Sequence, residues 1–251
     1  MLSYLLRLAD DNLVLAQRLS TLIARMPELE EDIAIANIGL DHLGQARNLY
    51  SHASQFDALG RDEDQFAMLR SEREYRNAVL VEQPDPDFAH TVVRQLFVDA
   101  YQVPLYQALA SSTDETLAGI AAKAVKEARY HLEYSSGWVI RLGDGTPESH
   151  ERCQAAVDAL WPFTADLFAG DPHDDGDADA ELVARGVAAD PAVLRPQFDK
   201  TIADVLGQAQ LRPPSDPYQR LGGRTGFHTE HLGHLLPEMQ SLYRAHPGAS
   251  W

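Results

Sequence analysis

The 251-residue chain has a single cysteine and no long apolar run. Cys153 has no second thiol with which to form an internal disulfide, and no neighbour in its helical stretch is placed to lower its pKa. We therefore expect an inert thiol in a reducing cytoplasm. Nowhere do eighteen apolar residues follow one another, which predicts that no helix spans a membrane. The apolar N-terminus is interrupted by Arg7 and is too short and too charged for a signal sequence.

Basic residues are also scarce. The chain has 21 Lys and Arg residues against 38 Asp and Glu residues, which gives a formal net charge of -17. This charge opposes binding to nucleic-acid phosphates and to anionic lipids, so neither is an expected partner. An anionic ligand, a coenzyme included, would need a local cluster of Arg or Lys that works against the overall field.

Strand signals are missing too, because apolar residues recur at helical spacing and not in alternation. The chain is predicted to be all-α, with long helices over residues 3–25, 29–56, 88–109 and 115–142, and shorter ones over 62–77 and 229–245. The four long helices form two antiparallel hairpins joined by one longer connection, which is typical of a ferritin-like four-helix bundle, although an up-down bundle is an alternative. We expect one domain over residues 1–251, with the core bundle in about 1–142 and peripheral C-terminal helices in about 148–251.

Three C-terminal segments are similar to binding motifs but lack residues that those motifs need. The acidic segment 171–182 has Leu182 where a calcium loop requires a bidentate acid, so a solvated acidic loop and a helix start are expected. The histidines of "HTEHLGH" drift by about 120° around a helix, which favours a capped helix start over a metal site, although neighbouring pairs remain an alternative. "LGGRTG" has no phosphate-loop lysine, and its arginine, Arg224, is expected at the surface or against a partner or coenzyme phosphate.

Each long predicted helix carries one acid within an otherwise apolar stripe. Steps of three and four residues place these acids on the core-facing sides of their helices. They are Asp41 beside Ile33 and Leu40, Asp99 beside Val92 and Leu96, Glu127 beside Ala124 and Tyr134, and, on the first helix, either Asp10 or Asp11.

The predicted register brings these acids to one level. Residues equidistant from a hairpin turn lie side by side, so Asp41 falls opposite Asp11, and Glu127 falls opposite Asp99. Buried acids are costly unless they are paired, protonated or bound to metal. The coincidence therefore requires an explanation.

A di-iron site requires a histidine three residues after the acid on the second and fourth helices. Those positions hold Gly44 and Tyr130, so each iron would lose its nitrogen donor. His42 and His131 each lie about 100° around the helix from the required place. A rearranged site that uses His131 at four-residue spacing from Glu127 remains an alternative.

The interpretation we favour is a former metal site that has been replaced by ion pairs or protonated acids. Lys123 lies one turn before Glu127, and Arg47 lies one turn beyond Gly44, so both are candidates for neutralising the acids. We expect no catalytic residue and no metal in this chain. The predicted vestigial di-iron positions are Asp11, Asp41, Gly44, Asp99, Glu127 and Tyr130.

Three long segments carry a family resemblance: "ELEEDIAIANIGLDHLGQARNLY", "AAKAVKEARYHLEYSSGWVIRLGDGT" and "TGFHTEHLGHLLPEMQ". They closely resemble the C subunits of bacterial ring-1,2-phenylacetyl-CoA epoxidases, and the resemblance runs nearly end to end. In that family the ferritin-like A subunit holds the di-iron centre and binds the coenzyme A thioester. The C subunit shares the fold, lacks a working metal site and pairs with A. A small B subunit and a flavin and iron-sulfur reductase complete an enzyme that uses O2 and NADPH to make a ring epoxide.

The resemblance implies a non-catalytic subunit that stabilises the A subunit in aerobic phenylacetate degradation, with no cofactor of its own. The expected partners are the A subunit, the B subunit and the reductase, and the chain alone is expected to be able to self-associate. Two alternatives remain at this point: a di-iron or di-manganese oxidase or oxygenase active in its own right, and a self-associating storage-type bundle.

Overall fold

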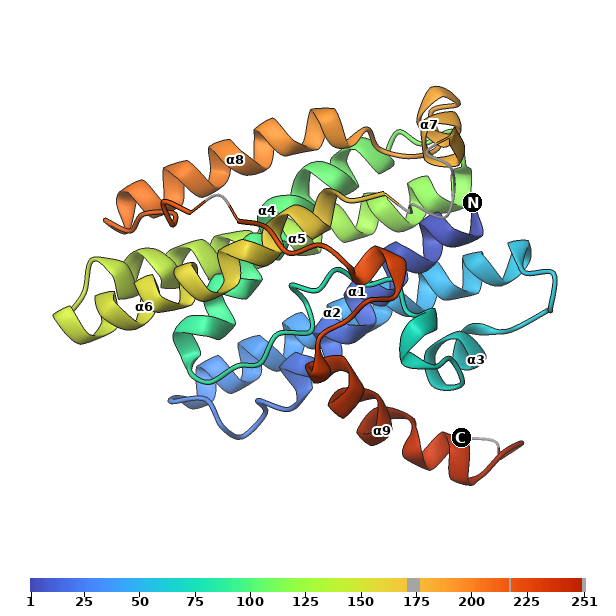
Figure 1. The fold of residues 1–251 in the computed structure, drawn as a ribbon, viewed down its shortest axis with the longest axis horizontal. Coiled ribbons are helices and arrows are strands. Elements are labelled where there is room, and N and C mark those ends of the chain that lie inside the picture. Colours follow the sequence, from blue (N-terminus) through green and yellow to red (C-terminus); the bar gives the residue numbers. More distant parts are fainter. Residues whose placement is uncertain (171–176, 217, 250–251) are drawn as a thin grey trace. The chain divides into compact units, whose positions relative to one another are not determined.

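The computed structural model describes residues 1–170, 177–216 and 218–249, and all regular elements in these ranges are helical (Figure 1). The α-helices are α1 Leu2–Ser20, α2 Leu29–Ala53, α3 Glu63–Met68, α4 Phe88–Leu109, α5 Glu115–Gly143, α6 Pro147–Leu160, α7 Asp177–Ala184, α8 Pro191–Gln208 and α9 Glu230–Ala245. The predicted all-α class is thus confirmed. None of the described helices combines the length and the apolarity that a bilayer crossing requires. The solvated loop predicted at 171–182 falls, over 171–176, outside the described residues.

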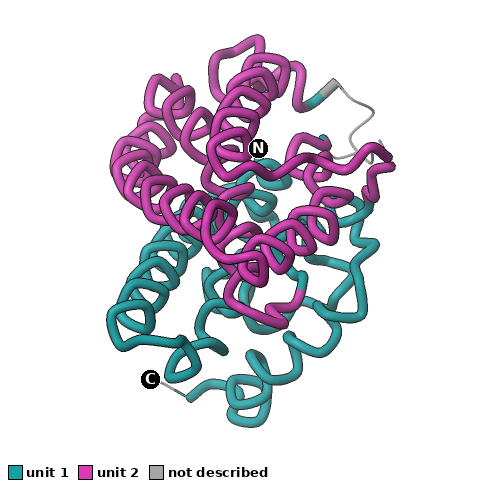
Figure 2. The backbone as a smooth tube through the Cα atoms, turned by 90° about the vertical axis from the view of Figure 1, so that its left-hand side faces the viewer, with its two compact units in different colours: residues 1–83, 170–178, 222–251 teal, residues 84–169, 179–221 magenta. Residues whose placement is uncertain are grey.

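The chain divides into two compact units (Figure 2). Unit 1 comprises residues 1–83, 170–178 and 222–251, and unit 2 comprises residues 84–169 and 179–221. Each unit contains one of the predicted hairpins, because α1 packs on α2 and α4 packs on α5. Helix α9 packs in unit 1, whereas α6 and α8 pack in unit 2. The single domain over residues 1–251 stays a prediction.

In unit 1, the hairpin of α1 and α2 has the predicted register. The Nδ1 atom of His42 lies 2.8 Å from Oδ1 of Asn12, as expected for a turn near Pro27. The prediction that the side of α2 with Ile33 and Leu40 faces the core is wrong, however, since these side chains are 54% and 64% exposed. The buried apolar residues of α2 are instead Ile35, Ile38, Ala46, Leu49, Tyr50 and Ala53.

The helix predicted over 62–77 is much shorter than expected. A capping box between Asp62 and Gln65 begins α3, which ends at Met68, and a 3-10 turn follows at Glu72–Glu74. The chain then runs through the interior as irregular backbone over 75–83. Buried backbone without a helix must find hydrogen-bond partners elsewhere, and here several are acids of α1.

Unit 2 is built on α4, which begins and ends where the sequence predicts. The Asp87 carboxylate caps its N-terminus by accepting a hydrogen bond from the His90 backbone at 2.9 Å. Helix α6 ends just before Pro162, at Leu160, and the chain continues as a 3-10 helix over Trp161–Phe168. The end of α5 packs closely on the end of α8 at Gly143. A Cβ atom there would lie only 2.4 Å from the backbone oxygen of Ala209, so the close approach requires glycine.

Candidate functional site

Both acids of α1 are buried in unit 1, and Asp10 is paired with an arginine. The Arg70 guanidinium donates to both carboxylate oxygens of Asp10, and the Tyr50 hydroxyl and the Arg76 backbone also donate to this carboxylate. Burial opposes the charge of Arg70, but Asp10 and Tyr50 beside it raise its pKa above the usual value. Burial, together with the Asp10 charge, also raises the pKa of the Tyr50 phenol. The buried carboxylate is therefore compensated by a guanidinium.

Asp11 is held by a second arginine from the other end of the chain. Two nitrogens of Arg224 donate to the two oxygens of Asp11, each at 2.8 Å, and the Ala78 backbone donates at 2.7 Å. Burial raises the pKa of the Asp11 carboxyl, and the charge of Arg224 opposes that shift. Arg224 is 2% exposed, so the expectation that it lies at the surface is wrong. A bidentate pair of this kind fixes geometry as well as charge.

A third buried acid, Glu82, lies at the end of the irregular segment 75–83. One of its oxygens is 2.9 Å from the Nδ1 atom of His228 and accepts from the Asn77 side-chain amide at 3.0 Å. The other oxygen accepts from the backbone and hydroxyl of Thr229. The start of "HTEHLGH" is thus anchored on an acid of another segment, whereas the N-cap residue Thr229 makes no side-chain capping hydrogen bond.

The remaining histidines of that segment do not join His228. The carbonyl of His231 accepts a hydrogen bond from Arg18 at 2.9 Å, and His234 is exposed. Among the described residues, these three histidines form no metal-binding group. In unit 1 the buried acids Asp10, Asp11 and Glu82 each lie against a basic side chain, and these side chains are not the ones that the sequence suggested.

The predicted positions on α2 take no part in these acid pairs. Asp41 is half-buried, and a Cβ atom at Gly44 would meet no atom within 4 Å. The Arg47 side chain is 76% exposed and lies 3.7 Å from Glu63. The prediction that Arg47 neutralises the core acids is therefore wrong.

In unit 2, Asp99 is fully buried and its carboxyl accepts hydrogen bonds from two neutral side chains. Gln95 donates to one oxygen and Ser135 donates to the other, each at 2.7 Å. Burial raises the pKa of Asp99 to about 8, and these two hydrogen bonds only partly oppose the shift. Asp99 is consequently protonated for the most part at pH 7.

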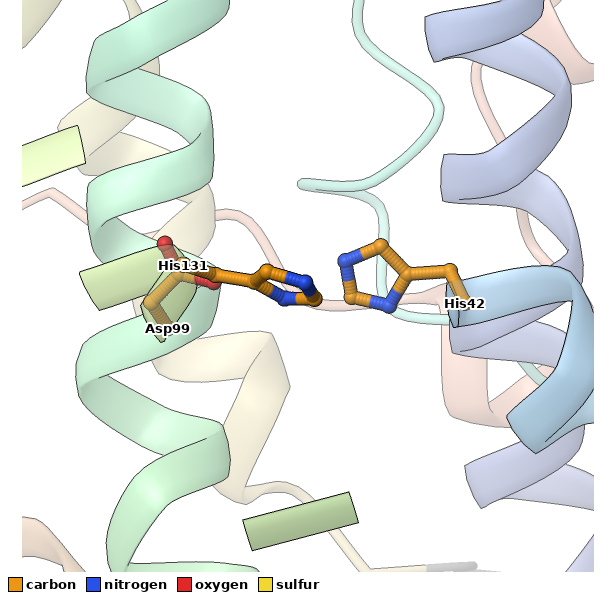
Figure 3. A group of neighbouring side chains, drawn as sticks. All are labelled: His42, Asp99 and His131. Carbon is orange, nitrogen blue, oxygen red and sulfur yellow. The ribbon is translucent and has the colours of Figure 1, made fainter. Parts of the chain in front are cut away.

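His131 of α5 lies beside Asp99 of α4 (Figure 3). A carboxyl oxygen of Asp99 and a ring nitrogen of His131 are within 4.8 Å of each other, and both residues are completely buried. Figure 3 also draws His42 of unit 1, which is the partner of Asn12 described above. In unit 2, Asp99 and His131 offer one oxygen and one nitrogen ligand, which is fewer than the ligands a di-iron centre takes.

Glu127 and Tyr130 do not lie where the register predicts. Glu127 pairs with Lys123 at 3.2 Å, as expected, but Tyr130 is 58% exposed. Ser135, and not Glu127, contacts Asp99, so the predicted pairing of Glu127 with Asp99 is wrong. Helical side chains tilt toward the N-terminus of their own helix. On α4 this tilt points away from the turn that joins α4 to α5, and on α5 it points toward that turn. Asp99 therefore meets residues farther along α5 than equal spacing from the turn suggests.

A comparison of the whole sequence with known families decides the relationship. A profile of the phenylacetic acid catabolic protein family matches residues 1–251. The chain belongs to this family. A curated relative, the C subunit of the 1,2-phenylacetyl-CoA epoxidase of Escherichia coli (strain K12), is 48% identical over 249 residues, which cover 99% of this chain and 98% of the relative. The resemblance to the epoxidase C subunits is thereby confirmed.

In this member of the phenylacetic acid catabolic family, the predicted vestigial positions differ in what they could offer to a metal ion. Gly44 has no ligand atom, and the ring of Tyr130 is largely exposed. Asp11, the predicted vestigial position on α1, has both oxygens engaged by Arg224. Asp99 is buried, and the two side chains that donate to its carboxyl are neutral, so burial keeps it an uncharged acid.

Proposed function

We propose that this chain is a non-catalytic structural subunit of a multicomponent phenylacetyl-CoA 1,2-epoxidase in phenylacetate degradation. It pairs with the di-iron A subunit in the cytoplasm and stabilises it, and the B subunit and a flavin and iron-sulfur reductase complete the complex. The proposal is supported by the identity to a relative named as the C subunit of such an enzyme. The chain itself holds no cofactor in this proposal.

The observation that carries the non-catalytic part is the pairing of the buried acids. Asp10 and Asp11 each bind a guanidinium, which occupies the carboxylate oxygens that a metal ion would need. Asp99 is stabilised as a neutral acid by burial. A carboxylate that is already bound by arginine is a poor donor to a divalent metal, and Asp99 would have to release its proton before it could bind one.

The stabilising role follows from mass action. A partner that binds only the folded A subunit shifts its folding equilibrium toward the folded state. The A subunit expressed without this chain should therefore be less soluble or inactive, and co-expression should restore soluble, active enzyme. Epoxidation of phenylacetyl-CoA and the iron content of each preparation are the measurements.

The isosteric variant Asp99→Asn separates this function from an oxidase or oxygenase active in its own right. In the proposed function, Asp99→Asn leaves epoxidation by the complex unchanged, because the amide has the shape of the protonated acid. The alternative predicts stoichiometric iron or manganese in the chain alone, lost in Asp99→Asn or His131→Gln. Epoxidation by this chain without the A subunit would refute the structural role.

A further inference from the structure

A cleft in unit 1 lies between α9 and the 3-10 turn at Glu72–Glu74, which pack against each other. It has a volume of about 480 Å³, which is enough for a small organic molecule or for one long side chain. The residues that line it are Ser71, Glu72, Gly233, Leu236, Pro237, Gln240, Ser241 and Arg244. The cleft is therefore distinct from the acid pairs described above, whose residues do not line it.

The Glu72 carboxylate stands in this cleft without a basic partner among the described residues. Its Oε2 atom would lie 3.0 Å from a Cβ atom at Gly233, so the carboxylate reaches across to α9. The described residues neither donate a hydrogen bond to this carboxylate nor form an ion pair with it. A half-buried carboxylate that has no cation beside it favours a positively charged ligand.

Pro237 leaves a backbone acceptor in the same cleft. In an α-helix, the carbonyl of one residue accepts a hydrogen bond from the N–H four residues later, and proline has no N–H. Pro237 lies inside α9, so the carbonyl of Gly233 is without its helical donor. Glycine at this position also has no side chain that could cover the carbonyl. The cleft thus offers a carboxylate and a backbone oxygen close to each other.

The other polar groups of the cleft add further acceptors. The Ser71 hydroxyl donates to the Glu74 carboxylate at 2.8 Å, and the Ser241 hydroxyl donates to the Glu238 carbonyl at 3.2 Å. With their protons used in this way, both hydroxyl oxygens can accept a hydrogen bond from a ligand. The side-chain amide of Gln240 already donates to three oxygens of unit 1, which leaves its own oxygen as an acceptor.

The one basic residue among the described residues that line the cleft is directed elsewhere. The Arg244 guanidinium donates to the backbone carbonyls of residues 68–70, each at 3.0 Å. Leu236 and Pro237 give the cleft an apolar wall. The net charge of -17 adds a field that attracts cations. Acceptors beside an apolar wall complement an ammonium group, which has three donors and no acceptor, on a hydrocarbon stem.

We propose that this cleft binds a primary alkylammonium group. The ammonium donates to the Glu72 carboxylate, to the Gly233 carbonyl and to the hydroxyl oxygen of Ser241. The hydrocarbon stem lies on Leu236 and Pro237. A free alkylamine and the side chain of a lysine in a peptide both carry this group, and the test separates these two sources. The proposal does not depend on the proposed function.

Titration of the full chain with n-pentylammonium chloride, followed by NMR of the backbone amides, tests the site. We expect saturable shifts at Glu72, Gly233 and Ser241, with a dissociation constant on the order of 1 mM for so small a ligand. 1-Pentanol has the same stem without the charge and should bind at least about tenfold more weakly. Nα-acetyl-lysine amide identifies the source: tighter binding than that of n-pentylammonium supports a lysine in a peptide, and equal or weaker binding supports a free amine.

Three variants test the assigned contacts. Glu72→Gln keeps the shape of the side chain but removes its charge, and should weaken n-pentylammonium binding about tenfold or more. Glu238→Gln removes an exposed acid of α9 that does not line the cleft, and should bind within about twofold of the unmodified chain. Pro237→Ala returns a helical N–H to the Gly233 carbonyl and should weaken binding about threefold.

The remaining outcomes overturn the proposal. Shifts that do not saturate, or that are spread over the chain, mean that no site exists at this cleft. Binding by Glu72→Gln within about twofold of the unmodified chain places the ammonium elsewhere, and equal binding of 1-pentanol removes the need for a cation. Thermal unfolding shows that each variant is folded, and Pro237→Ala provides the test where Glu72→Gln is not.

Discussion

The protonated state of Asp99 predicts how the stability of the chain depends on pH. The pKa of this carboxyl is raised from 3.8 in the unfolded chain to about 8 in the folded one. Between these values the folded state holds a proton that the unfolded state releases. The contribution of Asp99 to the free energy of unfolding therefore decreases as pH rises. A difference of one bound proton lowers the free energy of unfolding by about 1.4 kcal/mol per pH unit, which amounts to about 4 kcal/mol between pH 4 and pH 7.

The variant Asp99→Asn removes this dependence without removing the hydrogen bonds. The new amide can donate to the Ser135 hydroxyl, while its carbonyl oxygen still accepts from Gln95. The free energy of unfolding of Asp99→Asn, relative to the unmodified chain, should therefore increase by about 4 kcal/mol from pH 4 to pH 7.

Urea unfolding at several pH values, followed by the fluorescence of the three tryptophans, measures this difference. Ionisable groups that are remote from position 99 are common to both proteins, so their contributions cancel. Asp158→Asn changes an exposed carboxylate on α6 and should give a curve parallel to that of the unmodified chain. Parallel curves for Asp99→Asn as well would refute the argument, because they would mean that Asp99 is ionised in the folded protein.

Three further changes test unit 1 and α2. Arg224→Met leaves Asp11 buried without its cation and should lower the free energy of unfolding by about 3–5 kcal/mol, with partial rescue by Asp11→Asn, both measured by urea unfolding. His228→Ala removes the imidazole from its buried carboxylate partner, so amide hydrogen exchange at the start of α9 should become faster. Gly44→Ala should stabilise the chain by about 1 kcal/mol, because a Cβ atom there meets nothing within 4 Å. Gly119→Ala, which is equally open, is the comparison, and a lower melting temperature in Gly44→Ala alone would contradict the geometry.

The helix bounds were predictable where local signals act alone. Asp87 and Asp114 cap α4 and α5 through their own side chains, and both helices begin where the sequence indicates. The end of α1 was predicted too late, at Arg25, because the turn contains Ala24 with a φ of 66°, which the sequence does not signal. Likewise, residues 75–77 were included in the predicted helix over 62–77 but lie in irregular backbone, and the backbone of 76 and 78 binds the acids of α1.

The buried acids were predictable, but their partners were not. Stripe patterns place Asp99 and either Asp10 or Asp11 in the core, and all three are buried. Arg70 and Arg224 lie 60 and 213 residues away in sequence from the acids they pair with, so no local spacing reveals them. The outward face of α2 was mistaken for its core face because both faces are apolar, and periodicity cannot choose between two such stripes.

The pairing of the first helix with the last thirty residues fixes an order of events during synthesis. Asp11 is synthesised 213 residues before Arg224, and Glu82 is synthesised 146 residues before His228. Until then, unit 1 holds acids whose buried positions are uncompensated, whereas the segments of unit 2, residues 84–169 and 179–221, are already complete. Unit 2 should therefore fold first, and unit 1 should close only after Arg224 and His228 have been synthesised, which makes a segment 213 residues downstream of Asp11 the last step of folding for α1.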